Sequence, residues 1–219
     1  MYVGLKMLTD FVTITPDTLV RDADKLMDES KLWMLLVMDG DKLLGFVRKE
    51  DLRAALPSAM TSLDRNECTY LLSKLTIADI YHKNMTTISP DTEIEAAADL
   101  MYSMNLAGLA VVSKAGKLLG YINRSIMLEV LAEEMGHGEG GSRLTIPVED
   151  RQGVIYEITG IIANLKKNII STATFTHDKQ KMVVVRVATE DTSAIEEVLK
   201  ERGYKLLGPE AFQNMWEDK

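Results

Sequence analysis

The chain has 219 residues, of which 46% are hydrophobic and 26% are charged, and its net charge is −8 at pH 7. This composition is typical of a globular protein with one or two domains. The longest apolar run, residues 32–38, is far shorter than the roughly 20 residues of a membrane helix, so we expect no membrane association. The first ten residues show no export signal. A single cysteine, Cys68, favours a reducing compartment, and we expect a cytoplasmic protein.

The distribution of charge argues against nucleic acid as a partner. Residues 1–135 contain 14 basic and 20 acidic side chains, and residues 143–219 contain 11 and 12. Proteins that bind a phosphate backbone usually carry a basic excess in the binding domain. Neither part of the chain has such an excess, so we expect no nucleic-acid partner.

An internal repeat organises the first 135 residues. Segments 13–27 and 87–101 align at an offset of 74 with eight identical residues, and both contain the words Thr-Ile and Pro-Asp-Thr. After one inserted residue, the word Lys-Leu-Leu-Gly occurs at 42–45 and again at 117–120. The first part of the chain is therefore a tandem duplication, and repeats of this kind usually bury a face against each other.

Both copies predict the same elements in the same order. A short extended segment ends at a proline, which disfavours helix just before it. A helix follows, because Asp17 or Thr18 (Asp91 or Thr92 in the second copy) can cap it and apolar residues recur at helical spacing. Two strands joined by a turn come next, at 33–38 with 43–47 and at 109–112 with 118–122. Helices at 49–56 and 124–135 close the two copies, giving strand–helix–strand–strand–helix twice.

The segment between the copies, residues 57–74, predicts a helical insertion. Thr61 or Ser62 can cap its helix. The apolar residues that follow can pack on the repeats; they are Leu63, Tyr70, Leu71 and, just beyond the insertion, Leu75.

Two such copies in tandem resemble a pair of CBS domains, the arrangement known as a Bateman module. The resemblance rests on Thr-Ile-x-Pro-Asp-Thr in both copies and on Gly45 and Gly120 in the final strands. Lead-in segments at 3–7 and 75–80 match more loosely. The resemblance covers residues 1–135, with the first motif at about 1–56 and the second at 75–135.

The last part of the chain predicts a second domain. Residues 136–142 contain four glycines and are expected to form a flexible linker. Residues 143–219 then alternate between strand and helix patterns: strands at 144–148, 168–177, 182–189 and 204–207, and helices at 154–167 and 192–202. The order βαββαβ is that of a ferredoxin-like domain. The chain as a whole is therefore expected to have a mixed α/β (α+β) fold.

This second domain resembles an ACT domain, a small regulatory module. The words that carry the resemblance are Asp150-Arg-Gln-Gly-Val-Ile-Tyr-Glu-Ile158 and Lys167-Asn-Ile169. Gln152 and Lys167 stand where the family usually has proline and glycine. The order of two CBS domains and one ACT domain, together with the insertion, resembles the acetoin-utilisation protein family.

No catalytic or metal-binding pattern is visible in the sequence. Cys68 and the three histidines, at 82, 137 and 177, are scattered without the spacing of a catalytic triad or a metal site. We expect His82 to lie at the surface before the second repeat and His177 near a strand end. The sequence therefore predicts a protein that is not an enzyme and needs no cofactor.

The resemblance to CBS domains implies a site for an adenosine compound such as AMP, ATP or S-adenosylmethionine. The family's ribose-binding pattern is Gly-h-h-Thr/Ser-x-x-Asp, where h is hydrophobic, and the first copy supplies Asp51 at the carboxylate position. Arg48 replaces the Thr or Ser, and it either contacts phosphate or blocks the pocket. In the second copy Ile126 replaces the carboxylate, so that pocket lacks the ribose clamp. The alternative role of Asp51 is to stabilise the start of a helix.

The same resemblance implies where the adenine base would lie. It would stack among Met34 and Leu35 of the first copy and Thr87 and Ile88 of the second. At alternating spacing these residues are also ordinary core positions of strands.

The ACT resemblance implies a second effector, an amino acid. Its site would use residues of the two ACT motifs at 150–158 and 167–169, namely Asp150, Gly153, Val154, Asn168 and Ile169.

Two functions stay open from the sequence. The first is a regulator that senses a small-molecule effector. The second is a non-catalytic protein whose pockets are degenerate and which dimerises and docks on a partner enzyme. In both cases we expect a homodimer or a higher homo-oligomer, because two-fold self-association is the commonest symmetry.

Overall fold

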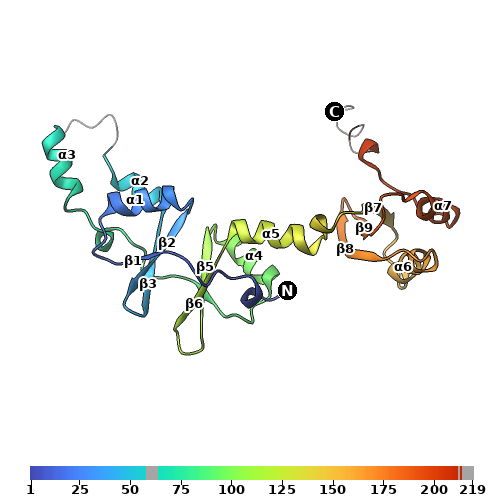
Figure 1. Ribbon diagram of the computed structural model, residues 1–219, viewed down its shortest axis with the longest axis horizontal. Coiled ribbons are helices and arrows are strands. Elements are labelled where there is room, and N and C mark those ends of the chain that lie inside the picture. Colours follow the sequence, from blue (N-terminus) through green and yellow to red (C-terminus); the bar gives the residue numbers. More distant parts are fainter. Residues whose placement is uncertain (58–63, 212, 214–219) are drawn as a thin grey trace. The chain divides into compact units, whose positions relative to one another are not determined.

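The computed structural model of the chain describes residues 1–57, 64–211 and 213. The chain forms two compact units, residues 1–128 and 129–219, and the division falls inside helix α5 (Arg124–Glu134). Figure 1 shows both units with their elements labelled. The finer domain limits expected from the sequence remain predictions.

The first unit contains the two repeats in the predicted order. The first repeat consists of β1 (Thr13–Ile14), α1 (Val20–Glu29), β2 (Met34–Asp39), β3 (Lys42–Arg48) and α2 (Lys49–Ala55). The second consists of β4 (Thr87–Ile88), α4 (Ile94–Ser103), β5 (Gly108–Val112), β6 (Leu118–Asn123) and α5. Each repeat has a three-stranded sheet, in the orders β1-β2-β3 and β4-β5-β6. In each sheet the first pair of strands is parallel and the second antiparallel, so the mixed α/β fold class is confirmed.

The predicted caps of the first helix in each repeat are wrong. Helices α1 and α4 begin only after Leu19 and Glu93, and neither N-cap makes a side-chain hydrogen bond. The hydroxyls of Thr18 and Thr92 instead accept hydrogen bonds from the backbone N–H groups of the residues three positions earlier, at 3.1 and 3.2 Å. Serine and threonine favour such turns. The hydroxyls therefore close the turn before the helix.

Strand β2 separates two apolar clusters. Leu35 and Val37 belong to the core between the first sheet and its helices. Met34 and Leu36 point to the opposite face, because successive side chains of a strand alternate. There they pack in a second cluster with Phe46 of β3 and with Ala110 and Tyr121 of the second repeat. This shared cluster buries the faces of the two repeats against each other.

The segments that precede the repeats are exchanged between them. The chain ahead of the first repeat pairs with the second, through a bridge between Leu8 and Tyr121. It includes the short helix η1 (Val3–Leu5). The chain ahead of the second repeat, which includes η2 (Ile77–Asp79), pairs with the first through a bridge between Phe46 and His82. The sequence shows both lead-in segments but not this exchange.

The insertion between the repeats contains helix α3 (Arg65–Leu72). Its N-cap is Asp64, whose carboxylate accepts hydrogen bonds from the backbone N–H groups of residues 66 and 67 at 2.7 and 2.8 Å. The predicted caps at 61 and 62, and the leucine at 63, lie outside the described residues. Tyr70 and Leu71 are largely exposed, so they do not pack as expected, whereas Leu75 contacts the core of the first repeat.

The second unit is an antiparallel sheet covered by two helices. Its elements are β7 (Ser142–Val148), α6 (Val154–Asn164), β8 (Ile169–His177), β9 (Gln180–Val187) and α7 (Ser193–Glu201). The strand order is β7-β9-β8, and Ile146, Ile158 and Ile195 are among the residues of its core. The strand predicted at 204–207 does not form. A backbone hydrogen bond of 2.9 Å joins the N–H of Leu207 to the carbonyl oxygen of Thr145 in β7, and one such bond does not make a strand ladder.

The glycine-rich segment expected to be a linker is hydrogen-bonded to the second unit. Residues His137–Glu139 form the short helix η3. The guanidinium group of Arg186 donates to the carbonyl oxygens of Met135, Gly140 and Gly141 at 3.1 to 3.2 Å. These bonds fix the backbone at both ends of the segment.

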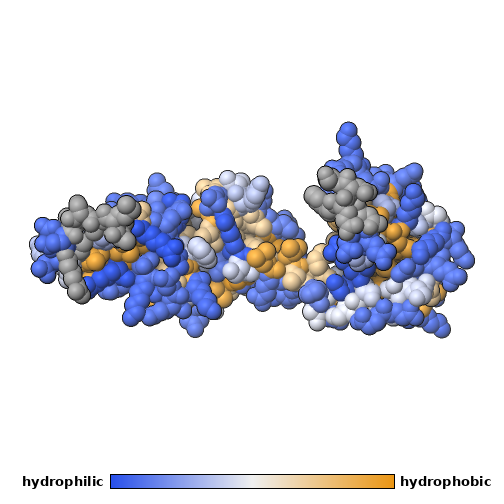
Figure 2. All heavy atoms as spheres, turned by 90° about the horizontal axis from the view of Figure 1, so that it is seen from above, coloured by the Kyte–Doolittle hydropathy of each residue, from blue (hydrophilic) through white to orange (hydrophobic). Residues whose placement is uncertain are grey.

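The surface seen in Figure 2 is mostly hydrophilic, as the charged composition leads one to expect.

Gly45 provides a test of the exchanged segments. A Cβ atom at this position would overlap with the backbone carbonyl of His82, which cannot move without breaking the Phe46–His82 bridge. We expect Gly45→Ala to destabilise the protein by roughly 1–3 kcal/mol, the usual cost of overpacking. The control is Gly160→Ala in α6, where a Cβ meets nothing within 4 Å. That change should stabilise the helix by about 0.5–1 kcal/mol. In urea unfolding followed by circular dichroism, an unchanged midpoint for Gly45→Ala would contradict the close approach.

Candidate functional site

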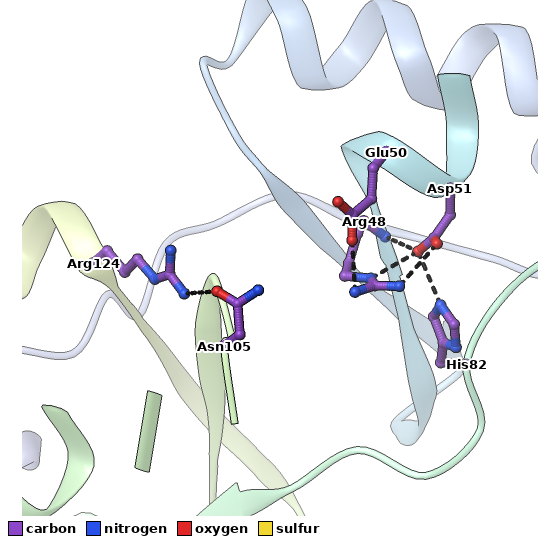
Figure 3. Close-up of polar contacts among 6 residues, drawn as sticks. All are labelled: Arg48, Glu50, Asp51, His82, Asn105 and Arg124. Atoms are coloured by element: carbon purple, nitrogen blue, oxygen red, sulfur yellow. Dashed lines mark hydrogen bonds and ion pairs between the residues drawn. The ribbon is translucent and has the colours of Figure 1, made fainter. Parts of the chain in front are cut away.

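Asp51 lies in the first turn of α2 and forms the centre of a polar cluster (Figure 3). Its Oδ2 atom accepts hydrogen bonds from the backbone N–H of Arg48 at 3.0 Å and from the Nε of the same residue at 3.1 Å. Its Oδ1 atom accepts from the Nη2 of Arg48 at 3.1 Å. The Nε2 atom of His82 lies 2.9 Å from Oδ2. The carboxylate therefore caps the helix and is held by two further side chains.

Arg48 is shared between two carboxylates. Besides the two-pronged contact with Asp51, its Nη1 atom lies 2.6 Å from the Oε1 atom of Glu50. A planar guanidinium group matches a carboxylate in this way better than an ammonium group does. Arg48 is thus ordered by the chain itself at the position where the family pattern has a short hydroxyl side chain.

His82 belongs to this polar cluster, and the sequence alone does not identify it as a member. Its ring stacks on Phe46, with centroids 5.0 Å apart and an angle of 27° between the planes. The side chain is 43% exposed, in keeping with the expected surface position, yet it also contacts Asp51, 31 residues earlier. The bridge between Phe46 and His82 places it there, and no sequence periodicity reports that bridge.

The cluster favours the ionised form of Asp51. Burial of the carboxyl group raises its pKa, but the hydrogen bonds from Arg48 and His82 outweigh this effect, so that the pKa of Asp51 lies below its ordinary value. The hydrogen bond to Asp51 in turn raises the pKa of Arg48. Asp51 is thus a carboxylate at neutral pH, with only 18% of its side chain exposed.

A cleft of about 590 Å³ lies between the two repeats beside this cluster. Arg48 contributes to its wall, and the Arg124–Asn105 pair of the second repeat faces it from the other side (Figure 3). Cationic side chains predominate in the lining, which contains Lys31, Arg48, Lys49, Arg53 and Arg124 but only one acidic residue, Glu50. The aromatic residues Trp33 and Tyr121 also contribute. Such a site favours an anionic ligand with an aromatic or apolar part.

The residues expected around the adenine base are not gathered in this cleft. Leu35 is buried in the core of the first repeat, and Met34 in the cluster shared by the repeats. Thr87 and Ile88 form β4, which pairs with β5 of the second repeat. Of the adenosine-site residues predicted from the sequence, Arg48 is the one that lines the cleft. Asp51 adjoins the cleft through its contact with Arg48.

The equivalent position of the second repeat has a different chemistry. Ile126 corresponds to Asp51 and is only 8% exposed, while Leu8 corresponds to His82. Asn123 corresponds to Arg48, and its side-chain oxygen accepts a hydrogen bond of 3.0 Å from the backbone N–H of Ile126. The helix start is thus capped in both repeats, but the second repeat presents no carboxylate at this position.

The predicted amino-acid site of the second unit is split within one chain. Asp150, Gly153 and Val154 lie at the start of α6, where Gly153 has a φ of +84°. Asn168 and Ile169 follow the other end of the helix, which spans 11 residues or about 16 Å. The structure therefore does not bring these two groups of residues together within a single copy.

A surface network beside the start of α6 was not predicted. Arg151 donates two hydrogen bonds to the carboxylate of Glu157, at 2.7 and 2.6 Å, and the hydroxyl of Tyr204 donates a third at 2.6 Å. The hydrogen bond from Arg151, followed by that from Tyr204, lowers the pKa of Glu157 to about 2. The network ties the segment after α7 to the start of α6.

The described residues contain neither a metal-binding cluster nor a membrane-spanning helix. In the parts of the chain that the structure describes, no group of three His, Cys, Asp or Glu side chains could hold a metal ion. Within the same residues, no helix has both the length and the apolar character needed to cross a membrane.

The fold and the cluster define a tandem-repeat module followed by a small antiparallel domain. The CBS domain family matches residues 3–58 and 77–133, and the TTHA0829-like ACT domain family matches residues 140–208. The chain therefore belongs to the CBS-domain family and carries a TTHA0829-like ACT domain after its two CBS domains. Both kinds of domain are regulatory modules.

Relatives of known sequence share mainly the CBS pair. A CBS domain-containing protein from Dictyostelium discoideum is 31% identical over 126 residues, which cover 57% of this chain and 87% of that protein. The homoserine O-acetyltransferase of Methanosalsum zhilinae is 29% identical over 117 residues, but these cover only 21% of the enzyme. The similarity to that enzyme is thus limited to a small part of it.

Solved structures show the same fold. CBSX2 of Arabidopsis thaliana, in complex with AMP, is 29% identical, with a TM-score of 0.50, and the match covers 60% of this chain and 96% of that one. A Vibrio cholerae protein described as an acetoin utilization protein (AcuB) is 23% identical with a TM-score of 0.53, covering 65% of this chain and 98% of that one. The second similarity shows the fold alone.

Proposed function

We propose that the protein is a ligand-sensing regulator whose first CBS domain binds an adenosine nucleotide at Asp51. The observation that carries this proposal is the ionised Asp51 carboxylate next to a cleft lined by cations. A carboxylate can accept hydrogen bonds from both ribose hydroxyls, and cations stabilise phosphate. The AMP complex of CBSX2 supports an adenosine ligand, because it is a CBS-pair structure similar to this one.

The charge of the cleft favours one class within the adenosine compounds. Five cationic side chains and one acidic side chain line it, which suits the phosphates of AMP or ATP. S-adenosylmethionine carries a sulfonium cation and no phosphate, so it fits the cleft less well. We therefore place AMP and ATP ahead of S-adenosylmethionine as ligands.

The rest of the chain supplies the regulatory context in this proposal. The ACT domain would bind an amino acid only where two copies bring the ends of α6 together, since one copy separates Asp150 from Asn168. The order of the domains supports a link to acetoin utilisation. Cys68, the single cysteine of the chain, supports a place in the reducing cytoplasm.

A second candidate function follows from the hydrogen bonds that Asp51 already accepts within the chain. Arg48 and His82 already donate four hydrogen bonds to it, and the second repeat has Ile126 in the equivalent position. A chain with both pockets closed would serve as a docking module for a partner enzyme, without a ligand. Binding measurements separate the two functions.

The nucleotide site is tested by removing its carboxylate. We expect one AMP site per chain, and we expect Asp51→Ala to weaken binding by about 10- to 150-fold, because a hydrogen bond to a charged group contributes roughly 1.5–3 kcal/mol. The control Asp17→Ala removes the same charge at an exposed position of the first repeat and should bind AMP like the wild type. Isothermal titration calorimetry gives affinity and stoichiometry. Two sites per chain, or undiminished binding by Asp51→Ala, would refute the assignment; no binding at all would favour the docking function.

We also propose that the chain works as a homodimer or a higher homo-oligomer. Several apolar side chains on helices of the first unit and on α5 are exposed, among them Tyr102, Leu128 and Leu131. Burial of such side chains in a two-fold interface would be favourable. Light scattering at micromolar concentration should give at least twice the chain mass of 24.4 kDa. A mass of one chain would contradict self-association.

A further inference from the structure

We propose that Arg48 makes the Asp51 site selective for phosphorylated ligands, because it holds the carboxylate in the free protein and releases it only when a phosphate is bound. This inference rests on the proposed nucleotide site and adds a specificity-determining residue to it. The site would then accept adenosine nucleotides and reject adenosine itself.

The Asp51 carboxylate has too few free acceptor positions for both hydroxyls of a ribose. A carboxylate offers about four lone-pair positions. Three donors lie on Oδ2, namely the backbone N–H and Nε of Arg48 and the Nε2 of His82, and the Nη2 of Arg48 lies on Oδ1. Oδ2 is thus fully used, and Oδ1 keeps at most one position. The remaining exposure of the Asp51 side chain is small, at 18%. Both ribose hydroxyls can therefore bind Asp51 only if one of these donors leaves.

Of the four donors, those on the Arg48 guanidinium group can leave at the lowest cost. The backbone N–H of Arg48 is part of the start of α2 and cannot withdraw without unwinding the helix. His82 is held by two backbone hydrogen bonds to Phe46, at 2.8 and 3.0 Å, and its imidazole stacks on the Phe46 ring. The guanidinium group lies at the end of a flexible side chain that already lines the cleft. It can turn away from Asp51 by side-chain rotation alone.

The charge of the cleft determines when this rotation is favourable. Once separated from Asp51, the guanidinium group would face the other cations of the cleft, Lys31, Lys49, Arg53 and Arg124. Asp28 forms ion pairs with Lys49 and Arg53, and Glu50 remains as the counter-charge of Arg48. Like charges at close range oppose such a state. A phosphate in the cleft replaces Asp51 as the partner of Arg48, whereas adenosine brings no charge and leaves Arg48 paired with the exposed carboxylate of Glu50 alone.

Two other cations of the cleft have partners of their own. Lys49 forms an ion pair with Asp28, and Arg124 donates hydrogen bonds of 2.8 Å to the backbone carbonyl of Leu106 and to the side chain of Asn105. Neither of them contacts Asp51. Arg48 is therefore the residue that connects the ribose acceptor with the phosphate-binding surface.

The variant Arg48→Thr tests the inference, because it installs the short hydroxyl side chain of the family pattern. Calorimetry with AMP and adenosine on the wild type should show AMP bound about 100-fold more tightly than adenosine. In Arg48→Thr the preference should fall below about 10-fold, through tighter adenosine binding as well as weaker AMP binding. The control is Arg53→Thr, which removes a cation from the same cleft without touching Asp51. It should weaken AMP binding and leave the affinity for adenosine unchanged.

The outcomes distinguish this inference from the proposed function. If wild type binds AMP but adenosine binds no more tightly to Arg48→Thr than to wild type, the inference is overturned and the nucleotide site stands. If neither protein binds any adenosine compound, the nucleotide site itself fails and the inference fails with it. Arg48→Gln, which keeps the length of the side chain without its charge, replaces Arg48→Thr if circular dichroism shows that the threonine variant does not fold; tighter adenosine binding is expected there as well.

Discussion

Two crossed backbone bridges hold the CBS pair together and position its candidate site. Phe46 and His82 exchange hydrogen bonds of 3.0 and 2.8 Å, and Leu8 and Tyr121 exchange bonds of 2.8 and 2.9 Å. In both cases the segment ahead of one repeat extends the sheet of the other. The repeats therefore cannot move apart without breaking sheet hydrogen bonds, and the His82 side chain is fixed beside Asp51. The shared cluster around Met34 and Tyr121 then excludes water from the contact.

Equivalent backbone positions hold charged side chains in the first repeat and uncharged side chains in the second. In the first, a carboxylate, a guanidinium group and an imidazole meet at the start of α2. In the second, the equivalent positions are Ile126, Asn123 and Leu8, and the amide of Asn123 alone is needed to cap the helix. Capping therefore does not require the charged cluster. What the first repeat adds is an ionised carboxylate next to a cationic cleft, and we propose that a ligand recognises this feature.

Much of the fold could be predicted from the sequence because it is encoded locally and twice. Helical and strand spacing located the elements, and the repeated words Thr-Ile-x-Pro-Asp-Thr confirmed their order in both copies. Two local features differ from the expectation, namely the caps of α1 and α4 and the last strand of the second unit. Thr18 and Thr92 were expected to cap helices, but their hydroxyls bond to backbone three residues earlier. The residues of the expected strand at 204–207 lie beside β7, but a backbone hydrogen bond between Leu207 and Thr145 takes the place of a strand ladder.

The candidate site was less predictable because its parts are distant in the sequence. Asp51 and Arg48 could be found from a family pattern, since they lie three residues apart. His82 could not, because its position depends on the exchange of the lead-in segments. The cleft joins residues of both repeats, such as Arg53 and Arg124, whose proximity follows from the packing of the two sheets. The hydrogen bonds between the Arg48 guanidinium group and Asp51 are likewise known only from the structure.

The central claim is that Asp51 exchanges Arg48 for a ribose when a nucleotide binds. A crystal structure of the protein with AMP tests it most directly. The account predicts that both ribose hydroxyls lie within hydrogen-bond distance of the Asp51 carboxylate and that the guanidinium group of Arg48 has turned to the phosphate. AMP bound with the Arg48–Asp51 pair intact, or bound away from Asp51, would contradict it.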